Sequence, residues 1–385
     1  MAYFRNRTIN LLNVHYAIHS LAATGGAAFF GVFLLEAGVP LPGVLVTIAL
    51  VLLGRFAIRP VVIAFAARYG LRAAVVVGTL LNGVQYPFLA EVHGIGPALT
   101  MLIAVSAIGE TVYWTTYHAY FAALGDDGLR GQQIGVREAI GAIIGIVSPI
   151  GTGWMLVTFG PRIAFGTMGA IAAAAALPIL WAPEVKIPRA APGAFKAAIP
   201  GILLFAADGW LTSGYALVWQ IALFYSLRES VLAYGGALAL AALVGAIAGL
   251  TLGRHIDAGH GKRAVWYAAG TVTLIGGLRA IAMGNAALAV LATALGAIGA
   301  CLYIPTLMTA VYTLAKRSPC TLRFHVATEG GWDIGGASGL LTAALLTSLG
   351  VPLPAIILVS LLGIAATVAV LRGYYRLPQT VALAD

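Results

Sequence analysis

Five ionisable residues inside otherwise apolar segments are the first candidates for chemistry in this sequence. They are Glu110, His118, Asp208, Glu329 and Asp333. A charged side chain at the centre of a bilayer costs about 2.5–3.5 kcal/mol or more, so each one needs a partner or a task. A carboxyl group buried without a nearby cation favours its protonated form. No intramembrane Lys or Arg lies beside Asp208, Glu329 or Asp333. Proton coupling is therefore the sharper hypothesis for them, with a bound metal cation or a hydrogen-bonded structural acid as alternatives.

Three segments repeat polar and aromatic residues at helical spacing. The first runs Glu110, Tyr113, Trp114, Tyr117 and His118; the second Asp208, Thr212, Tyr215 and Trp219; the third His325, Glu329, Trp332 and Asp333. Residues three, four, seven and eight positions apart share one face of a helix. Three such faces in an apolar chain predict a shared aqueous cavity that binds substrate. Alternatively, the aromatic rings pack as core and each acid is bonded to a neighbouring helix.

Basic residues inside the apolar segments suggest ion pairs or an anion anchor. Arg55 and Glu110 both lie about halfway along their segments, so they can form an ion pair. The competing hypothesis is that Arg55 anchors an anionic group of the substrate. Arg59 and Arg137 can likewise form ion pairs with Glu138, which lies closer to the cytoplasmic side.

Two histidines in the first apolar segment lie one helical turn apart. His15 and His19 therefore face the same way and suit a proton relay or a pair of metal ligands. A third possibility is that this polar stretch only lines the cavity.

The composition requires these residues to be positioned by helices in a membrane. The chain has 385 residues, of which 61% are hydrophobic and 9% charged, against about a quarter charged in a soluble domain. One span of hydrocarbon needs about 20 apolar residues, so the chain can supply about a dozen. Its 48 glycines favour close helix packing in lipid. The net charge of +9 is spread over short connectors, which argues against nucleic acid as a partner.

Twelve apolar segments can be separated by Gly, Pro or charge. They cover residues 11–36, 42–66, 70–90, 96–123, 133–158, 161–182, 198–225, 231–252, 263–282, 286–315, 320–349 and 351–372. Sixteen Lys and Arg residues fall on the side of the N-terminus, and Arg162, Arg228 and Arg279 fall on the other. The positive-inside rule then places both termini in the cytoplasm. The prediction is a multi-pass protein of the cytoplasmic (inner) membrane.

A polar connector at the midpoint divides the chain into two similar halves. We expect an N-terminal six-helix bundle over residues 1–182, a cytoplasmic linker over 183–197 and a C-terminal six-helix bundle over 198–385. A displacement of about 190 residues places IGETVYW at 108–114 over IGACLYI at 298–304. Parallel repeats of this kind place a binding site near the midplane, where the halves meet.

The connectors after the second and eighth segments carry a short motif. The later one reads GRHIDAGHGKR, with Gly253, Asp257, Gly261, Lys262 and Arg263; the earlier one reads AARYGLR, with Arg68, Gly70 and Arg72. Both resemble the signature of the major facilitator superfamily, in which a Gly, an Asp and a further Gly precede basic residues. The earlier copy has Ala67 where the family has its acid. The resemblance implies an all-α integral membrane protein of twelve transmembrane helices in two pseudo-symmetric six-helix bundles.

The fifth segment carries a second resemblance to the same superfamily. Gly135, Ser148, Pro149, Thr152 and Gly153 are spaced as in its antiporter motif. Proline opens a backbone hydrogen bond, and small neighbours let two helices approach closely. This motif favours export, although a Gly/Pro kink in any packed helix has the same composition.

These observations predict a secondary active transporter that moves a small solute by alternating access, coupled to protons and favouring efflux by antiport. We expect a monomer without cofactor or resident metal. A proton-coupled importer and a passive facilitator of a metabolite or metal ion are the alternatives in the same class. From other classes, the alternatives are a membrane-embedded enzyme with a metal held by His15 and His19, and a transporter-like receptor.

Overall fold

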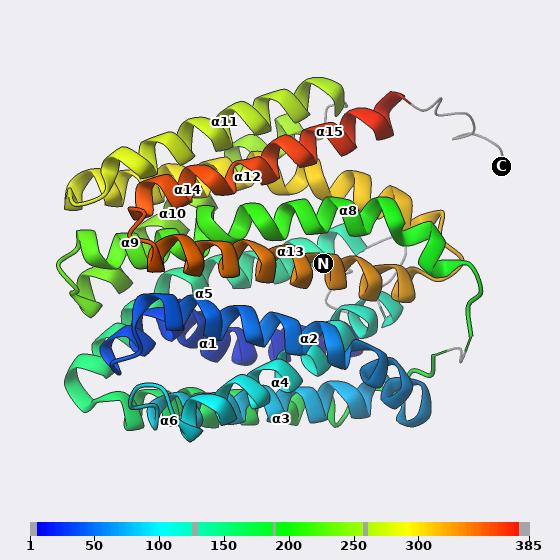
Figure 1. The fold of residues 1–385 in the computed structure, drawn as a ribbon. Helices are drawn as coiled ribbons and strands as arrows, with labels where there is room; N and C mark the ends of the chain where they lie inside the picture. The colour runs from blue at the N-terminus through cyan, green and yellow to red at the C-terminus, as the bar shows by residue number, and fades with distance from the viewer. Residues whose placement is uncertain (1–5, 125–129, 188–189, 257–260, 377–385) are drawn as a thin grey trace. The chain divides into compact units, whose positions relative to one another are not determined.

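The computed structural model describes residues 6–124, 130–187, 190–256 and 261–376, and every regular element in these ranges is a helix (Figure 1). Tertiary contacts divide the chain into two units. The first unit is Met1–Ala190 with Gln220–Leu243, and the second is Ala191–Trp219 with Val244–Asp385. The division after Ala190 falls inside the linker expected over 183–197. Residues 220–243 group with the first unit, although the sequence analysis assigned them to the second bundle.

The helices of the first half are α1 (Arg7–Glu36), α2 (Leu41–Tyr69), α3 (Leu71–Ala90), α4 (Pro97–Leu124), α5 (Arg130–Phe159), α6 (Pro161–Ala174) and the short α7 (Ala176–Ile179). The later elements are α8 (Ala194–Thr212), a π-helical turn η2 (Ser213–Val218), α9 (Trp219–Ser226), α10 (Val231–Ile256), α11 (Gly261–Ala282), α12 (Ala286–Lys316), α13 (Thr321–Ser348), α14 (Leu353–Ser360) and α15 (Leu362–Arg376). Their bounds agree with the twelve expected segments to within a few residues.

Eleven helical segments of the described residues are long and apolar enough to cross a membrane. The twelfth expected span corresponds to α13, which is 28 residues long. Its length is sufficient, but Arg323, Glu329 and Asp333 together with its many glycines leave it without an 18-residue stretch as apolar as those of the eleven. A helix that carries several polar groups in lipid must turn them towards other protein, since lipid cannot satisfy them.

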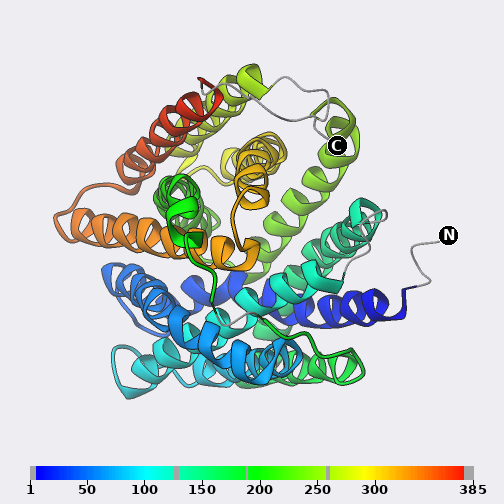
Figure 2. The same cartoon turned by 90° about the vertical axis from the view of Figure 1, so that its right-hand side faces the viewer.

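The two units repeat the same helix pairings. In the first unit α1 packs on α5 and α6, and α3 packs on α4. In the second unit α8 packs on α13 and α15, and α11 packs on α12. The pairing of α8 with α13 can be followed in Figure 1 and, turned by 90°, in Figure 2. Because first, fifth and sixth spans of each half pack alike, the internal repeat expected from the sequence is also present in the packing.

Glycine contacts repeat in the same way at one place in each half. The missing side chain of Gly54 leaves room for Ala107 of α4, and that of Gly245 leaves room for Ala297 of α12. Both pairs join the second and fourth spans of a half. Small residues of this kind let membrane helices approach closely where lipid supplies no hydrophobic drive for association.

Each unit has its own apolar core. In the first unit the core includes Ile9, Leu12, Tyr113, Tyr117 and Tyr120, all with 1% exposure or less. In the second unit it is built around Leu204, Leu211, Tyr303 and Phe324. In each half, aromatic residues of the fourth span therefore contribute to the core of that unit.

Candidate transport site

Asp208 lies at the centre of a hydrogen-bonded group in the second unit. The Tyr303 hydroxyl donates to its Oδ1 at 2.8 Å, and the Trp332 indole N–H donates to its Oδ2 at 3.1 Å. The three side chains come from α8, α12 and α13, so three helices meet at one carboxyl group. Both of these donors are neutral groups. Of the expected cavity residues, the structure thus brings Asp208 and Trp332 together and adds Tyr303.

Glycines explain how Trp332 reaches Asp208. A Cβ atom on Gly209 would collide with the carbonyl oxygen of Trp332, and one on Gly335 would collide with that of Ala206. Since glycine has no side chain, the backbones of α8 and α13 lie close together at these points. This close packing holds the indole ring against the acid of the opposite helix.

Three other polar residues of α13 were expected at this site, and they differ in burial. Asp333 is fully buried, whereas Glu329 is half-buried. His325 is also half-buried and makes edge-on ring contacts with Tyr312 and Phe324 at 5.9 and 5.7 Å. The proton-coupling roles expected for Glu329 and Asp333 stay predictions.

The second expected stripe is interrupted by the π-helical turn η2. This turn covers Ser213–Val218, between Thr212 and Trp219. Bonding from residue i to i+5 changes the angular spacing, so positions before and after the turn do not keep the register of an α-helix. The prediction that Asp208 and Trp219 share one helical face through regular spacing was therefore wrong. Thr212, at the end of α8, is half-buried.

Arg279 is a buried residue that the sequence analysis counted only among the basic residues on the side of the membrane opposite the N-terminus. Only 6% of it is exposed, and its Nη1 donates to the carbonyl oxygen of Tyr215 in the π-helical turn. Its guanidinium carbon lies 4.1 Å from the centre of the Tyr215 ring and 5.3 Å from that of Trp219. The Trp219 indole donates in turn to Thr293 at 3.1 Å. Tyr215 and Trp219 thus pack against the guanidinium of Arg279. This role is evident only because the last turn of α11 is buried.

In the first unit the ion pair expected between Arg55 and Glu110 is confirmed. Arg55 Nη1 lies 2.8 Å from Glu110 Oε2, and the two side chains are 12% and 27% exposed. Arg59 is buried and donates to the Thr115 hydroxyl at 3.3 Å. Glu110 is therefore a paired acid, whereas no described Lys or Arg forms an ion pair with Asp208.

Arg137 on α5 lies against aromatic rings of the first unit. Its guanidinium carbon is 5.6 Å from the ring centre of Tyr16 and 5.2 Å from that of Phe121. The side chain of Glu138, with which it was expected to pair, lies outside the described residues.

The two histidines of α1 are fully buried against the tyrosines of α4. His15 Nδ1 lies 2.6 Å from the carbonyl oxygen of Ala175, so this nitrogen must carry the proton. His15 Nε2 lies 3.0 Å from the Tyr113 hydroxyl. His19 stacks on the Tyr113 ring at 3.8 Å between ring centres. Both ring nitrogens of His15 are thus hydrogen-bonded, so His15 is unsuited to ligate a metal.

The first polar-aromatic stripe divides between core and surface. Tyr113 and Tyr117 are fully buried, Trp114 is half-buried, and His118 is exposed and stacks on Trp114 at 5.6 Å. Within the described residues, no group of three or more His, Cys, Asp or Glu side chains could hold a metal ion. The metal centre of the enzyme alternative therefore finds no ligand set in the described part of the chain.

An acid from a distant segment reaches the loop between α2 and α3. Gly70 has φ +92° and ends α2. The Glu184 carboxylate accepts from the backbone N–H of Arg72 at 2.8 Å and lies 3.5 Å from its Nε. Glu184 thus supplies a carboxylate where the loop itself has Ala67. The Arg68 guanidinium lies over the ring of Tyr69 at 5.4 Å.

The second copy of this motif is mostly beyond the described part of the chain. Asp257 lies outside the described residues, as do the side-chain surroundings of Gly253, Gly261 and Lys262, and Arg263 is exposed.

The small residues of α5 form close contacts inside the first unit. The Ser148 hydroxyl donates to the Leu21 carbonyl at 2.6 Å. A Cβ atom on Gly25 would collide with Thr152. The surroundings of Gly135 lie outside the described residues.

Two further contacts join α5 to α10. A Cβ atom on Gly235 would come within 2.5 Å of the Pro149 carbonyl oxygen, and one on Gly153 within 3.2 Å of that of Val231. We call these contacts the α5–α10 seam. The motif residues Pro149 and Gly153 therefore pack helix on helix, as their small size predicts.

Eleven apolar spans in the described residues, with α13 as the expected twelfth, a repeated packing scheme and buried charges inside the helices are the features to be compared with known proteins. A family model described as Major Facilitator Superfamily matches residues 16–317. The chain therefore belongs to the Major Facilitator Superfamily, which makes it a membrane transporter and not an enzyme. No curated protein matches the chain significantly.

Solved structures of transporters share the fold. The human organic anion transporter MFSD10 (TETRAN) matches with TM-score 0.69 and 16% identity, covering 95% of this chain and 99% of that one. The POT family transporter PepTSo matches with TM-score 0.70 and 13% identity over 96% and 98%. A mutant form of the nucleoside transporter NupG matches with TM-score 0.71 and 13% identity over 96% and 100%. At these identities the likeness describes the fold alone.

Proposed function

We propose that this transporter couples the movement of a small solute to protons and that Asp208 carries the proton. The observation behind this proposal is the carboxyl group that receives hydrogen bonds from Tyr303 and Trp332, both neutral donors. The two donors stabilise the charged form, whereas the apolar surroundings favour the neutral form. Because these two effects oppose each other, a modest change in geometry decides whether Asp208 binds the proton.

In this proposal, helix movement changes the proton affinity of Asp208. Tyr303 belongs to α12 and Trp332 to α13, while Asp208 belongs to α8. A shift of either helix along α8 removes one donor, and the loss of a hydrogen bond to a charged group is worth about 1.5–3 kcal/mol. A transporter that rearranges its helices between inward-open and outward-open states can thereby take up the proton on one side and release it on the other.

We propose export, by exchange of the solute against protons, as the direction. The support is the α5–α10 seam, in which the residues resembling the antiporter motif lie in close helix contact. A proton-coupled importer would use the same Asp208, and a facilitator would not need it. Direction and coupling are therefore tested separately.

A small organic solute is the proposed cargo, moved across the cytoplasmic membrane by a monomer whose termini both face the cytoplasm. The similar structures are described as transporters of organic anions, of peptides and of nucleosides. Their variety gives no reason to choose one of these classes for this chain. Arg55, the expected anchor for an anion, is already paired with Glu110.

Proteoliposomes that contain the purified protein and a trapped pH-sensitive dye test the proposal. A panel of sugars, carboxylates, nucleosides and organic cations is added outside, with and without a pH gradient. Solute-dependent proton movement supports coupling, and opposite directions of solute and proton support export. Solute flux without proton movement would indicate a facilitator. Movement of solute and protons in the same direction would indicate an importer.

A further inference from the structure

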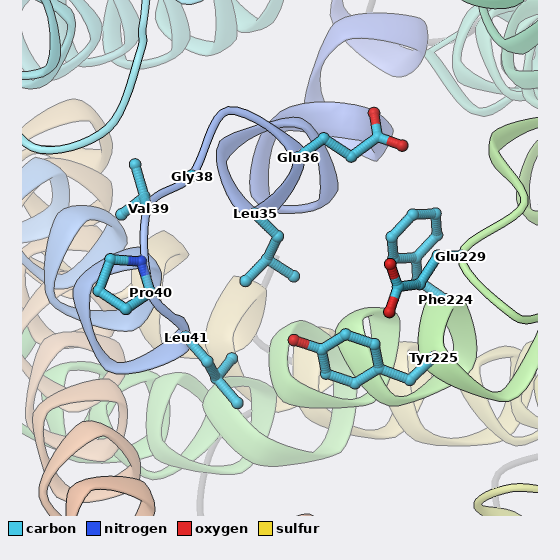
Figure 3. A pocket seen from close by; sticks show the side chains of 9 residues that line it. All are labelled: Leu35, Glu36, Gly38, Val39, Pro40, Leu41, Phe224, Tyr225 and Glu229. Atoms are coloured by element: carbon cyan, nitrogen blue, oxygen red, sulfur yellow. The ribbon is translucent and has the colours of Figure 1, made fainter.

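A pocket of about 300 Å³ opens at the end of α1 in the first unit (Figure 3). It is bounded by the last turn of α1, the α1–α2 turn and the turn that follows α9. Two acids, Glu36 and Glu229, belong to its lining, and the remaining seven residues are uncharged. A volume of this size is at the lower end of the range for small-molecule sites.

The electrostatic potential of the pocket is negative for two separate reasons. Glu36 and Glu229 are exposed acids, and no described Lys or Arg forms an ion pair with either. In addition, α1 ends at Glu36 and α9 ends at Ser226, and neither helix has a basic residue in its last turn. The C-terminus of a helix carries the equivalent of about half a negative charge. Two helix ends and two carboxylates therefore favour a cation.

The backbone holds Glu229 at the pocket. The N–H of Arg228 donates to the carbonyl oxygen of Tyr225, and that of Glu229 donates to Phe224, each at 3.0 Å. Both residues have positive φ, at 56° and 59°. The turn is thus closed onto the last turn of α9, and Arg228 itself is not among the residues that line the pocket.

Apolar and aromatic groups line the rest of the space. Leu35 comes from α1, Val39 from the α1–α2 turn and Leu41 from the start of α2, and Phe224 and Tyr225 come from α9. Figure 3 shows the Tyr225 hydroxyl pointing into the opening beside Leu41. An aromatic ring attracts a cation placed over its face. Hydrocarbon walls, by contrast, offer nothing to a hydrated metal ion.

We propose that this pocket binds an organic cation, an amine or onium ion with a hydrophobic body. Its charge lies between Glu36 and Glu229, and its body lies against Leu35, Leu41 and Tyr225. A divalent metal ion is the less suitable occupant, since the described residues offer no third His, Cys, Asp or Glu ligand here. This site goes beyond the proposed proton coupling, because it uses none of the groups around Asp208.

Binding of tetraphenylphosphonium to the purified full-length protein in detergent tests the proposal. Each exposed carboxylate is worth up to about a fivefold change in affinity, and Glu36→Gln with Glu229→Gln together are expected to weaken binding about tenfold. The matched control is Glu91→Gln, an exposed acid paired with Arg162 at 2.8 Å, which should leave binding unchanged. Higher ionic strength should weaken the wild-type complex, since exposed charges are screened.

Three outcomes would overturn the proposal. The first is equal affinity of wild-type protein and the double variant, and the second is an equal loss in the Glu91 control. The third is displacement of the probe by magnesium or calcium at equal concentration, which would indicate a metal site instead. Asp208→Asn separates this result from the transport proposal, because it should abolish proton movement while binding tetraphenylphosphonium at this pocket as the wild type does.

Discussion

The hydroxyl of Tyr303 donates a hydrogen bond of 2.8 Å to the carboxylate of Asp208. In the first half of the chain the equivalent tyrosine, Tyr113, lies 3.0 Å from the ring nitrogen of His15. Each half therefore joins its fourth span to its first through a tyrosine and an ionisable group. One half uses a base and the other an acid, so the repeat preserves the bond while the chemistry differs.

Replacement of Tyr303 by Phe removes one donor to Asp208 and leaves the ring in place. The carboxylate then loses a stabilising bond worth about 1.5–3 kcal/mol, so protonation becomes easier. We expect the pH profile of proton-driven transport to move to higher pH by about one to two units, since about 1.36 kcal/mol corresponds to one unit. Tyr312→Phe, on the same helix, is the control. An unchanged pH profile in the Tyr303→Phe variant would show that this tyrosine has no part in proton coupling.

The pair of Arg55 and Glu110 is expected to be structural. Arg55→Gln or Glu110→Gln alone leaves a half-buried charge without its partner, at a cost of about 1–3 kcal/mol after allowance for the partial exposure of both side chains. Thermal unfolding in detergent should show both single variants melting below the wild type. The double variant should recover much of the loss, since no uncompensated charge is left. A double variant as unstable as the sum of the two single variants would argue against direct pairing.

Arg279 is expected to stabilise the π-helical turn of the seventh span. Arg279→Lys keeps the charge but loses the planar group that stacks on Tyr215 and Trp219 and donates to the Tyr215 carbonyl. We expect a loss of about 2–4 kcal/mol of unfolding free energy, as for other disrupted buried groups. Arg228→Lys, at an exposed turn, should have little effect. Equal melting temperatures of the Arg279→Lys variant and the wild type would contradict this role.

Gly70 is expected to tolerate no side chain. Its φ of +92° is rarely adopted by other residues, and an added Cβ would collide with the Glu184 carboxylate. Gly70→Ala should therefore cost about 1–3 kcal/mol. Glu184→Gln should cost less than about 1 kcal/mol, with an effect that shrinks in high salt, since the Arg72–Glu184 pair is partly exposed. Denaturation in detergent at two salt concentrations measures both, and a Glu184 variant more harmful than the Gly70 variant would reverse the argument.

The sequence predicts the spans and some of the pairs because both depend on local properties. Apolar runs of about 20 residues identify the helices, and the depth along two such runs is enough to pair Arg55 with Glu110. By the same reasoning Asp208 stands out as an acid without a cation nearby.

Other features depend on tertiary packing that spacing does not encode. Arg279 lies near the end of its expected span, and its contact with the π-helical turn is evident only from the fold. That turn itself has no distinct composition, so the register of Trp219 cannot be derived. Glu184 is separated from Arg72 by more than a hundred residues, and only the fold brings it to the loop that lacks an acid.

The proton-carrying role of Asp208 is tested most directly by comparing two modes of transport in one variant. Counterflow exchanges labelled for unlabelled solute and needs no net proton movement, whereas accumulation against a gradient does. In proteoliposomes of Asp208→Asn we expect counterflow to persist and pH-driven accumulation to be lost. Accumulation at the wild-type level in this variant would contradict the account.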